Sequence, residues 1–259
     1  MTFFRAIFLA AVQGITEFLP VSSSGHLVLF QKLFRLSGPV VLFDVLLHLG
    51  TLAAILIFFR KNLLLLVKNW KSHQKEWMFL AVGSIPIAFF GFWLNLRIER
   101  IFNSLNLVGI MWIFFGIFLL STRWLVKRQL LQKKPPEAKW QDSLVVGFFQ
   151  ALALFPGVSR AGSTIIGGMF RKFSPETAFY LSFLLSIPAI LGAVFLKLAA
   201  GNVGKIDLGV GTVSVIVSAL VGYLSLKILK KTLMSDKFYF FGFYCLVLGL
   251  IVFLTTRYL

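Results

Sequence analysis

The sequence predicts an all-α polytopic membrane protein, built as an inverted-topology repeat of six transmembrane helices plus two re-entrant helical hairpins. Of the 259 residues, 58% are hydrophobic and 14% are charged, whereas a soluble domain carries about 25% charged residues. Long apolar stretches recur from end to end, and two pairs of shorter ones are broken by proline. We therefore expect residues 1–259 to form a single integral membrane domain.

A helix that crosses the bilayer needs about 20 predominantly apolar residues. Six stretches reach that length and are predicted to span the membrane: 40–59, 77–96, 105–124, 176–196, 208–229 and 238–257.

Two further pairs of apolar segments are each interrupted by a proline. Residues 3–19 run into Pro20 and are followed by 21–35, and residues 143–155 run into Pro156 and are followed by 158–173. Each arm has about 15 residues, which is short for a span. Broken backbone at membrane depth is tolerated only where it is buried in protein or lines a cavity. Each pair is therefore predicted to be a re-entrant hairpin.

The distribution of the 26 Lys and Arg residues predicts the orientation. We assign the net charge of +17 to the positive-inside bias of membrane proteins and not to nucleic-acid binding. One side carries Arg60, Lys61, Lys68, Lys71, Lys75, Arg123, Lys127, Arg128, Lys133, Lys134, Lys139, Arg171, Lys172, Lys227, Lys230, Lys231 and Lys237. The other side carries only Arg5, Lys32, Arg35, Arg97, Arg100, Lys197, Lys205 and Arg257. The first group is predicted to be cytoplasmic, so the first hairpin enters from outside and the second from inside.

Both halves then have the same order of elements, a hairpin followed by three spans, in opposite orientations. The predicted division is repeat 1 at 1–125, a basic cytoplasmic loop at 126–142, and repeat 2 at 143–259. An offset of 137 residues aligns 12–26 with 149–163 without gaps. Five aligned pairs are identical: Gln13 with Gln150, Phe18 with Phe155, Val21 with Val158, Ser22 with Ser159, and Gly25 with Gly162.

Polar side chains gather at both predicted hairpin tips. The first tip contains Gln13, Glu17, Ser22, Ser23, Ser24 and His26, and the second contains Gln150, Ser159, Arg160, Ser163 and Thr164. Ionisable groups inside a membrane are costly and usually functional. An arginine fork together with hydroxyls and backbone N–H groups at helix starts favours phosphate. Two such tips meeting near the membrane midplane predict a site for a phosphorylated substrate.

Individual residues in these tips allow more than one role. Gln13 and Glu17 share a helix face and are placed to hold a divalent cation through oxygen atoms. His26 is suited to act as acid, base or nucleophile. Glu17 with Arg160 also fits a buried structural ion pair, and single hydroxyls also fit a bond to a carbonyl one turn back. We interpret Asp44 and His48, in the first predicted span, as packing or supporting residues.

The two tips resemble the undecaprenyl-diphosphate phosphatase family, also called the bacitracin-resistance proteins. The family's first signature appears as QGITEFLPVSSSGH at 13–26, its second as PGVSRAGST at 156–164, and FLLSIPAILGA at 183–193 is similar to a further block. The resemblance covers essentially the whole chain. Gln13 departs from the commoner Glu, which removes a negative charge from the metal site. Ala161 stands where the family usually has Ser, which indicates either that a hydroxyl is dispensable at this position or that the site is weakened, and we favour the first interpretation.

The resemblance implies a multi-pass bacterial inner-membrane hydrolase with its active site open to the outer face. It would convert undecaprenyl diphosphate to undecaprenyl phosphate in carrier-lipid recycling for peptidoglycan synthesis, which confers bacitracin resistance. The implied partners are the membrane and a polyprenyl diphosphate lipid, and the implied cofactor is Mg²⁺, or alternatively Ca²⁺. By position, the resemblance covers Gln13, Glu17, Ser22, Ser23, His26, Ser159, Arg160 and Thr164, and the polar tips add Ser24 and Ser163. We expect Glu17, Ser23, His26 and Arg160 to act in catalysis, Ser22, Ser24, Ser159, Arg160, Ser163 and Thr164 to bind the diphosphate, and Gln13 and Glu17 to hold the metal.

Three mechanisms remain open at this point. Ser23 attacks with His26 as its base, which we favour narrowly, or His26 attacks directly, or Glu17 activates a water molecule. The competing function is a polyprenyl-phosphate transporter or flippase, because inverted repeats with broken helices also build carriers. The oligomeric state is open as well, with a homodimer as one alternative.

Overall fold

The computed structural model describes residues 2–36, 41–102, 104–127, 132–199, 204 and 206–256, without the side chains of 94–102 and 125–127. Several basic residues used to predict the orientation therefore lie outside the description: Arg97, Arg100, Lys127, Arg128, Lys205 and Arg257.

The described residues form eleven α-helices and one short 3₁₀ turn, Pro135–Glu137, without any β-strand. The α-helices are α1 (Phe3–Phe18), α2 (Ser23–Leu33), α3 (Val41–Phe58), α4 (Arg60–Lys68), α5 (Gln74–Phe102), α6 (Leu105–Lys127), α7 (Trp140–Leu152), α8 (Arg160–Phe170), α9 (Pro175–Ala199), α10 (Leu208–Met234) and α11 (Phe240–Thr255).

Five of these helices, α3, α5, α6, α9 and α10, are long and apolar enough to cross a membrane. This confirms an all-α polytopic membrane protein. The sixth predicted span, 238–257, corresponds to α11, an apolar helix of 16 residues that falls short of the length a span ordinarily needs. Helix α11 begins two residues after the predicted start and ends two residues before the predicted end, at Phe240 and Thr255.

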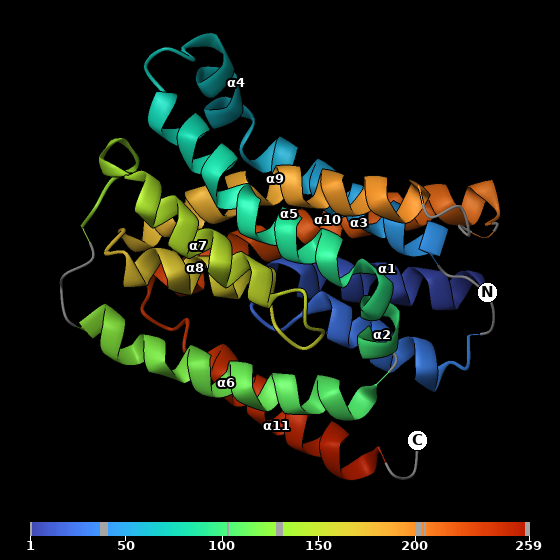
Figure 1. Cartoon of the computed structure of the whole chain (residues 1–259). Coiled ribbons are helices and arrows are strands. Elements are labelled where there is room, and N and C mark those ends of the chain that lie inside the picture. Colours follow the sequence, from blue (N-terminus) through green and yellow to red (C-terminus); the bar gives the residue numbers. More distant parts are fainter. Residues whose placement is uncertain are drawn as a thin grey trace.

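The two hairpins are α1 with α2 and α7 with α8, and Figure 1 shows them entering the molecule from opposite ends. Helices α2 and α8 each have 11 residues, and their first residues, Ser23 and Arg160, are 137 positions apart. Their N-cap residues show the same offset, because the Ser22 hydroxyl accepts from the backbone N–H of Gly25 and the Ser159 hydroxyl from that of Gly162. The internal alignment found in the sequence therefore relates equivalent helices.

Each hairpin is packed against a long helix from the other half of the chain. Helix α1 lies along α10, and α7 lies along α5. Both contacts are close: a Cβ atom on Gly14 would lie 2.9 Å from the backbone N of Gly222, and one on Gly147 would lie 2.4 Å from the carbonyl O of Gly83. Small residues allow such approach between membrane helices. The division into 1–125, 126–142 and 143–259 stays a prediction.

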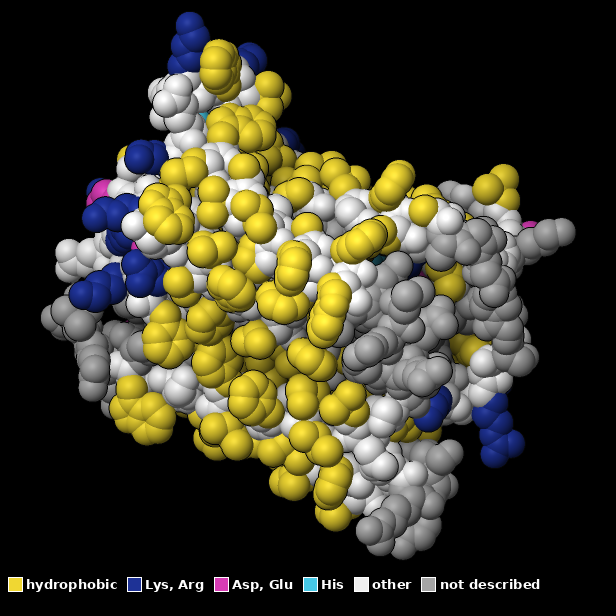
Figure 2. All heavy atoms as spheres, viewed as in Figure 1, with side chains coloured by type: hydrophobic (Ala, Val, Ile, Leu, Met, Phe, Trp, Pro, Cys, Tyr) yellow, Lys and Arg dark blue, Asp and Glu magenta, His cyan; other side chains and the backbone are white. Residues whose placement is uncertain are grey.

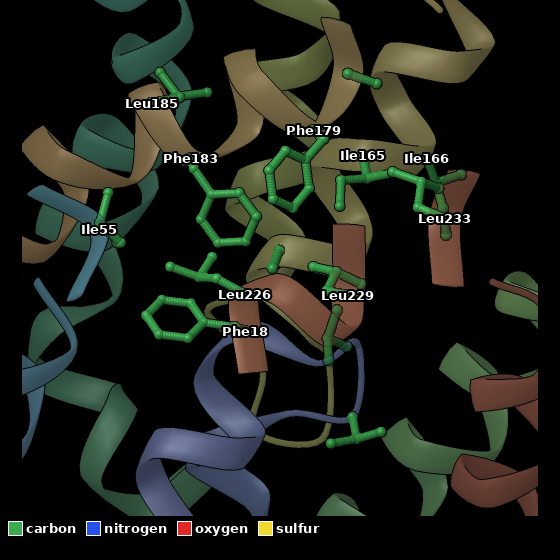
Figure 3. Packing of buried hydrophobic residues seen from close by; sticks show 14 of the residues in the cluster. Phe18, Ile55, Ile165, Ile166, Phe179, Phe183, Leu185, Leu226, Leu229 and Leu233 are labelled. Atoms are coloured by element: carbon green, nitrogen blue, oxygen red, sulfur yellow. The ribbon is translucent and has the colours of Figure 1, made fainter. Parts of the chain in front are cut away.

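A buried aromatic cluster fixes the end of α1. Figure 3 shows Phe18 pointing toward Phe183 of α9 and Leu226 of α10, with Phe179 beside them. The rings of Phe18 and Phe183 lie 5.6 Å apart between centroids in an edge-on arrangement. Because Glu17 precedes Phe18 in the same helical turn, this packing also fixes the position of the Glu17 carboxylate.

The surface separates into an apolar band and a basic end. Figure 2 shows hydrophobic side chains over the middle of the molecule and Lys and Arg side chains gathered at the left, around α4 and the start of α7. Between the predicted spans 40–59 and 77–96, where no helix was predicted, the structure contains helix α4. Its Leu66 side chain is buried, whereas Leu64 and Val67 are exposed. The run of four leucines therefore lies in a helix of which Leu66 packs into the protein, and the many basic residues around it obscured this helix in the sequence.

The second hairpin is tied at its base. Asp142, in the first turn of α7, is fully buried and accepts from Lys133 and, at 2.7 Å, from Nε of Arg171 just after α8. The Lys133 backbone N–H also donates to the Lys172 carbonyl at 2.9 Å. These bonds connect the basic loop to both arms of the hairpin and hold its tip at a fixed depth.

Candidate active site

The tips of the two hairpins are joined directly by their N-cap serines. The Ser22 hydroxyl accepts from the Gly157 backbone N–H at 3.0 Å, and the Ser159 hydroxyl donates to the Leu19 carbonyl at 3.5 Å. The backbone turns sharply at both tips, with φ of 69° at Ser22 and 103° at Gly157. The structure thus gives Ser22 and Ser159 structural partners, and of the two only Ser159 also lines the cavity described below.

Glu17 is the centre of the site, and three side chains donate to its carboxylate. Nη2 of Arg160 donates to Oε1 at 2.8 Å, while the Ser23 hydroxyl at 2.5 Å and Nε2 of Gln13 at 3.0 Å donate to Oε2. The predicted pairing of Gln13 and Glu17 on one helix face is therefore observed. The carboxylate has an ion-pair partner from the other hairpin and a hydroxyl partner from its own.

His48 also belongs to this network. Its Nδ1 atom lies 2.9 Å from Nε2 of Gln13. Because an amide nitrogen can only donate, Nδ1 accepts and the ring proton lies on Nε2. The bond to Gln13 is the kind of supporting contact that the sequence allowed for His48, and His48 lines the cavity as well. The signal was present in the sequence: Asp44 and His48 are four residues apart on one face of an otherwise apolar helix.

A cavity of about 130 Å³ lies against this network. Its polar wall consists of Glu17, Ser23, Ser24, His48, Ser159 and Arg160, and its apolar wall consists of Ile87, Val158, Ala189, Ile190 and Ala193. The residues at the start of α2 and at the start of α8 are both represented, so two helix N-termini adjoin one cavity. Helix N-termini attract anions because their backbone N–H groups are unpaired and the helix dipole is positive there.

The structure does not bring His26 to Ser23. Nδ1 of His26 is bonded to the Ser22 carbonyl at 2.7 Å, and Nε2 is bonded to the Tyr244 hydroxyl at 2.8 Å. The ring is buried and packs edge-on against Trp112. His26 does not line the cavity, and both ring nitrogens are engaged. The favoured scheme, in which His26 is the base for Ser23, has no support in this geometry.

Two residues of the second motif, Ser163 and Thr164, also do not line the cavity. The Thr164 hydroxyl donates to the Arg160 carbonyl at 2.8 Å and contacts the Ser182 hydroxyl at 2.5 Å, so it bonds within α8 and to α9. Ser163 is fully buried, and its hydroxyl has no partner among the described residues. Ser24, by contrast, lines the cavity and contacts Ser22 at 3.2 Å. The diphosphate-binding role is therefore better supported for Ser24 and Ser159 than for Ser163 and Thr164.

The donor set fits a divalent cation with few protein ligands. Within the described residues there is no group of three or more His, Cys, Asp or Glu side chains that could hold a metal. Both oxygens of Glu17 already accept hydrogen bonds, but Oε1 of Gln13 is buried beside them and has no partner. Magnesium in proteins is often held by one or two side chains plus substrate phosphates. Gln13 and Glu17 are compatible with that kind of site and not with a closed protein cage.

Sequence comparison identifies the family to which these motifs belong. The family described as "Bacitracin resistance protein BacA" matches residues 6–251. The chain belongs to the BacA family. Among its curated relatives is a protein named undecaprenyl-diphosphatase from Carboxydothermus hydrogenoformans, 41% identical over 97% of each chain. One with the same name from Pelotomaculum thermopropionicum is 40% identical over 97% of this chain and 96% of that protein. Undecaprenyl-diphosphatase 3 of Bacillus cereus is 36% identical over the same shares. This BacA family chain thus matches its relatives along almost its entire length.

Proposed function

We propose that this BacA family protein is an undecaprenyl-diphosphate phosphatase. It hydrolyses undecaprenyl diphosphate to undecaprenyl phosphate and phosphate, which recycles the carrier lipid for peptidoglycan synthesis and confers bacitracin resistance. The observation that carries this proposal is a serine hydroxyl bonded to a buried carboxylate, Ser23 to Glu17 at 2.5 Å, at a cavity where two helix N-termini meet Arg160. The names of its relatives support the same substrate.

Arg160 is suited to hold the phosphate. Its Nη2 atom is bonded to Glu17, but Nη1 is buried and has no partner among the described residues. A buried donor without a partner is costly, and a phosphate oxygen in the cavity would satisfy it. The N–H groups in the first turns of α2 and α8 and the Nε2–H of His48 would provide the further donors that a diphosphate requires.

The geometry favours Ser23 as nucleophile with Glu17 as its base. Ser23 Oγ attacks the terminal phosphorus while its proton passes to Glu17 Oε2. The bond from phosphorus to the bridging oxygen breaks, and undecaprenyl phosphate leaves. Water then attacks the phosphoserine, Glu17 returns its proton to Ser23 Oγ, and phosphate departs. Arg160 compensates charge on the transferred phosphoryl group throughout, which is the main contribution of a protein to this chemistry.

The divalent cation remains part of the proposal. Mg²⁺, or alternatively Ca²⁺, would be held by Gln13 and Glu17 together with the substrate, and when bound it would neutralise charge on the diphosphate. The homodimer also remains a prediction.

Phosphate release by purified protein in detergent, where transport has no meaning, tests the function. We expect release from undecaprenyl diphosphate, and Ser23→Ala should lower its rate by on the order of 10³-fold or more. Ser121→Ala is the matched control, because the Ser121 hydroxyl bonds only a carbonyl of its own helix.

The flippase alternative gives a different result. A carrier needs to grip the phosphate but does not need a serine bonded to a carboxylate. Lipid movement in proteoliposomes without phosphate release in detergent would favour the carrier. Full activity of Ser23→Ala would instead remove Ser23 as the nucleophile and leave the water mechanism.

We further propose that the protein lies in the inner membrane with the basic end in the cytoplasm and the site open to the outer face. In cells expressing Thr2→Cys, Ser72→Cys or Glu137→Cys, an impermeant thiol reagent should label position 2 and leave positions 72 and 137 unlabelled. All three side chains are exposed, and the single native cysteine, Cys245, is buried, so it should give little background. The opposite labelling pattern would reverse the orientation.

A further inference from the structure

The cavity has two chemically different walls, and only the polar wall offers hydrogen-bond donors to phosphates. The apolar wall is formed mainly by α5 and α9, through Ile87 on the first and Ala189, Ile190 and Ala193 on the second. A lipid diphosphate has the same division, because its phosphates need donors while its prenyl chain gains by contact with apolar surface. The chain must also reach the bilayer without passing through the packed core.

Both helices present lipid-facing apolar side chains beside this wall. On α5, Ile85, Phe89 and Phe92 are 58%, 63% and 79% exposed and lie on one face. On α9, Leu191, Phe195 and Leu198 repeat the same spacing and are also exposed. Figure 2 shows hydrophobic side chains covering the molecule over α5, where they would meet lipid. The apolar wall of the cavity and the apolar outer surface therefore belong to the same two helices.

Small residues occupy the helix faces between the wall and the outer surface. Successive residues of an α-helix are rotated by about 100° around its axis. On α9, this places Gly192 between Ala193 of the cavity wall and Phe195 of the outer surface. On α5, it places Ala88 and Gly91 between Ile87 of the cavity wall and Phe92 of the outer surface. A Cβ atom on Gly192 would meet nothing within 4 Å, and one on Gly91 would meet only a Leu154 methyl group at 3.9 Å. These positions therefore leave space beside the wall.

A proline stands inside each helix next to the wall, Pro86 before Ile87 and Pro188 before Ala189. A proline within a helix removes one backbone hydrogen bond and bends the helix. Each helix continues through its proline but lacks one backbone N–H donor next to the cavity.

Taking the proposed function as given, we propose that the prenyl chain of the substrate leaves the cavity between α5 and α9, past Gly192, Ala88 and Gly91, into the bilayer. The cavity holds the diphosphate, and this seam holds the first part of the chain. Bulk placed in the seam should therefore weaken binding of a long prenyl diphosphate and leave a substrate with a very short chain unaffected.

The test compares undecaprenyl diphosphate with isopentenyl diphosphate in detergent. Gly192→Trp should raise KM for undecaprenyl diphosphate by about tenfold, because the chain loses its apolar path, and should change kcat/KM for isopentenyl diphosphate less than about twofold. Gly192→Ala is the matched control for the glycine. Ile216→Trp on the exposed face of α10 is the control for bulk, since Ile216 is 51% exposed away from the cavity.

The second variant, Ala88→Trp, probes the other side of the seam, and melting temperatures show whether each variant is folded. Equal effects of Gly192→Trp and Ala88→Trp on both substrates, or no effect on either substrate, would overturn the proposed route. A wild-type protein that hydrolyses neither substrate would instead overturn the phosphatase function itself, so the two failures are distinguishable.

Discussion

Replacement of Arg160 by lysine is expected to lower kcat/KM for undecaprenyl diphosphate by roughly 10²–10³-fold, the range for loss of one donor aimed at developing charge. The two terminal nitrogens of the guanidinium have different roles. Nη2 is bonded to Glu17, while Nη1 remains free for the phosphate. A lysine keeps the positive charge but offers a single point of contact, so it can satisfy the carboxylate or the phosphate but not both in the same geometry.

Steady-state kinetics in detergent, together with melting temperatures, would measure this effect. Arg60→Lys is the matched control, because Arg60 is an exposed residue of α4 far along the chain from either hairpin. Since the charge is kept, the melting temperature of Arg160→Lys should change much less than its activity. Near-normal hydrolysis by Arg160→Lys would remove Arg160 from the site.

Glu17→Gln is expected to abolish most of the activity and to destabilise the fold by about 3–5 kcal/mol, the cost of leaving one member of a buried ion pair alone. The side chains of Glu17 and Arg160 are only 8% and 12% exposed. The amide would also place donors opposite Ser23 and Gln13, which themselves donate to this position. Glu176→Gln is the control, because Glu176 pairs with Lys230 at the surface, where a pair contributes about 1 kcal/mol or less.

A magnesium titration of the same variant separates two roles of Glu17. If Gln13 and Glu17 hold the cation, the residual activity of Glu17→Gln should need a higher magnesium concentration for half-saturation, and Gln13→Glu should lower that concentration. If Glu17 acts only as base and partner of Arg160, extra magnesium should not restore Glu17→Gln. An unchanged cation dependence in both variants would contradict the metal assignment and leave the phosphatase function intact.

The elements of the fold were largely predictable, because their signals are local. Proline at positions 20 and 156 and the polar residues around it predicted both hairpins, and the 137-residue offset located α8 from α2. Helix α4 was missed because its leucines lie within a run of basic residues that is also typical of a loop. The length of α11 was overestimated because hydropathy alone does not determine where a helix ends.

The site was predictable only in part, since its geometry depends on how distant helices are rotated. Glu17, Ser23 and Arg160 were placed together because their motifs are adjacent to the two breaks. The engagement of His26 by Tyr244 was not predictable, because Tyr244 is 218 residues away on α11. The contact of His48 with Gln13 depends on which face α3 turns toward α1, and the sequence indicates the polar face without indicating its neighbour.

The ion pair between Glu17 and Arg160 joins residues that are 143 positions apart. At synthesis rates of about 5–20 residues per second, Arg160 leaves the ribosome roughly 7–30 s after Glu17. The first hairpin and at least three further helices are therefore made before the carboxylate can meet its counter-charge. A chain truncated before residue 160 would contain an intramembrane carboxylate without its positive partner, and only a chain that includes the second hairpin supplies that counter-charge. The carboxylate that accepts from Ser23 therefore receives its ion-pair partner only after the start of the second hairpin helix has been made.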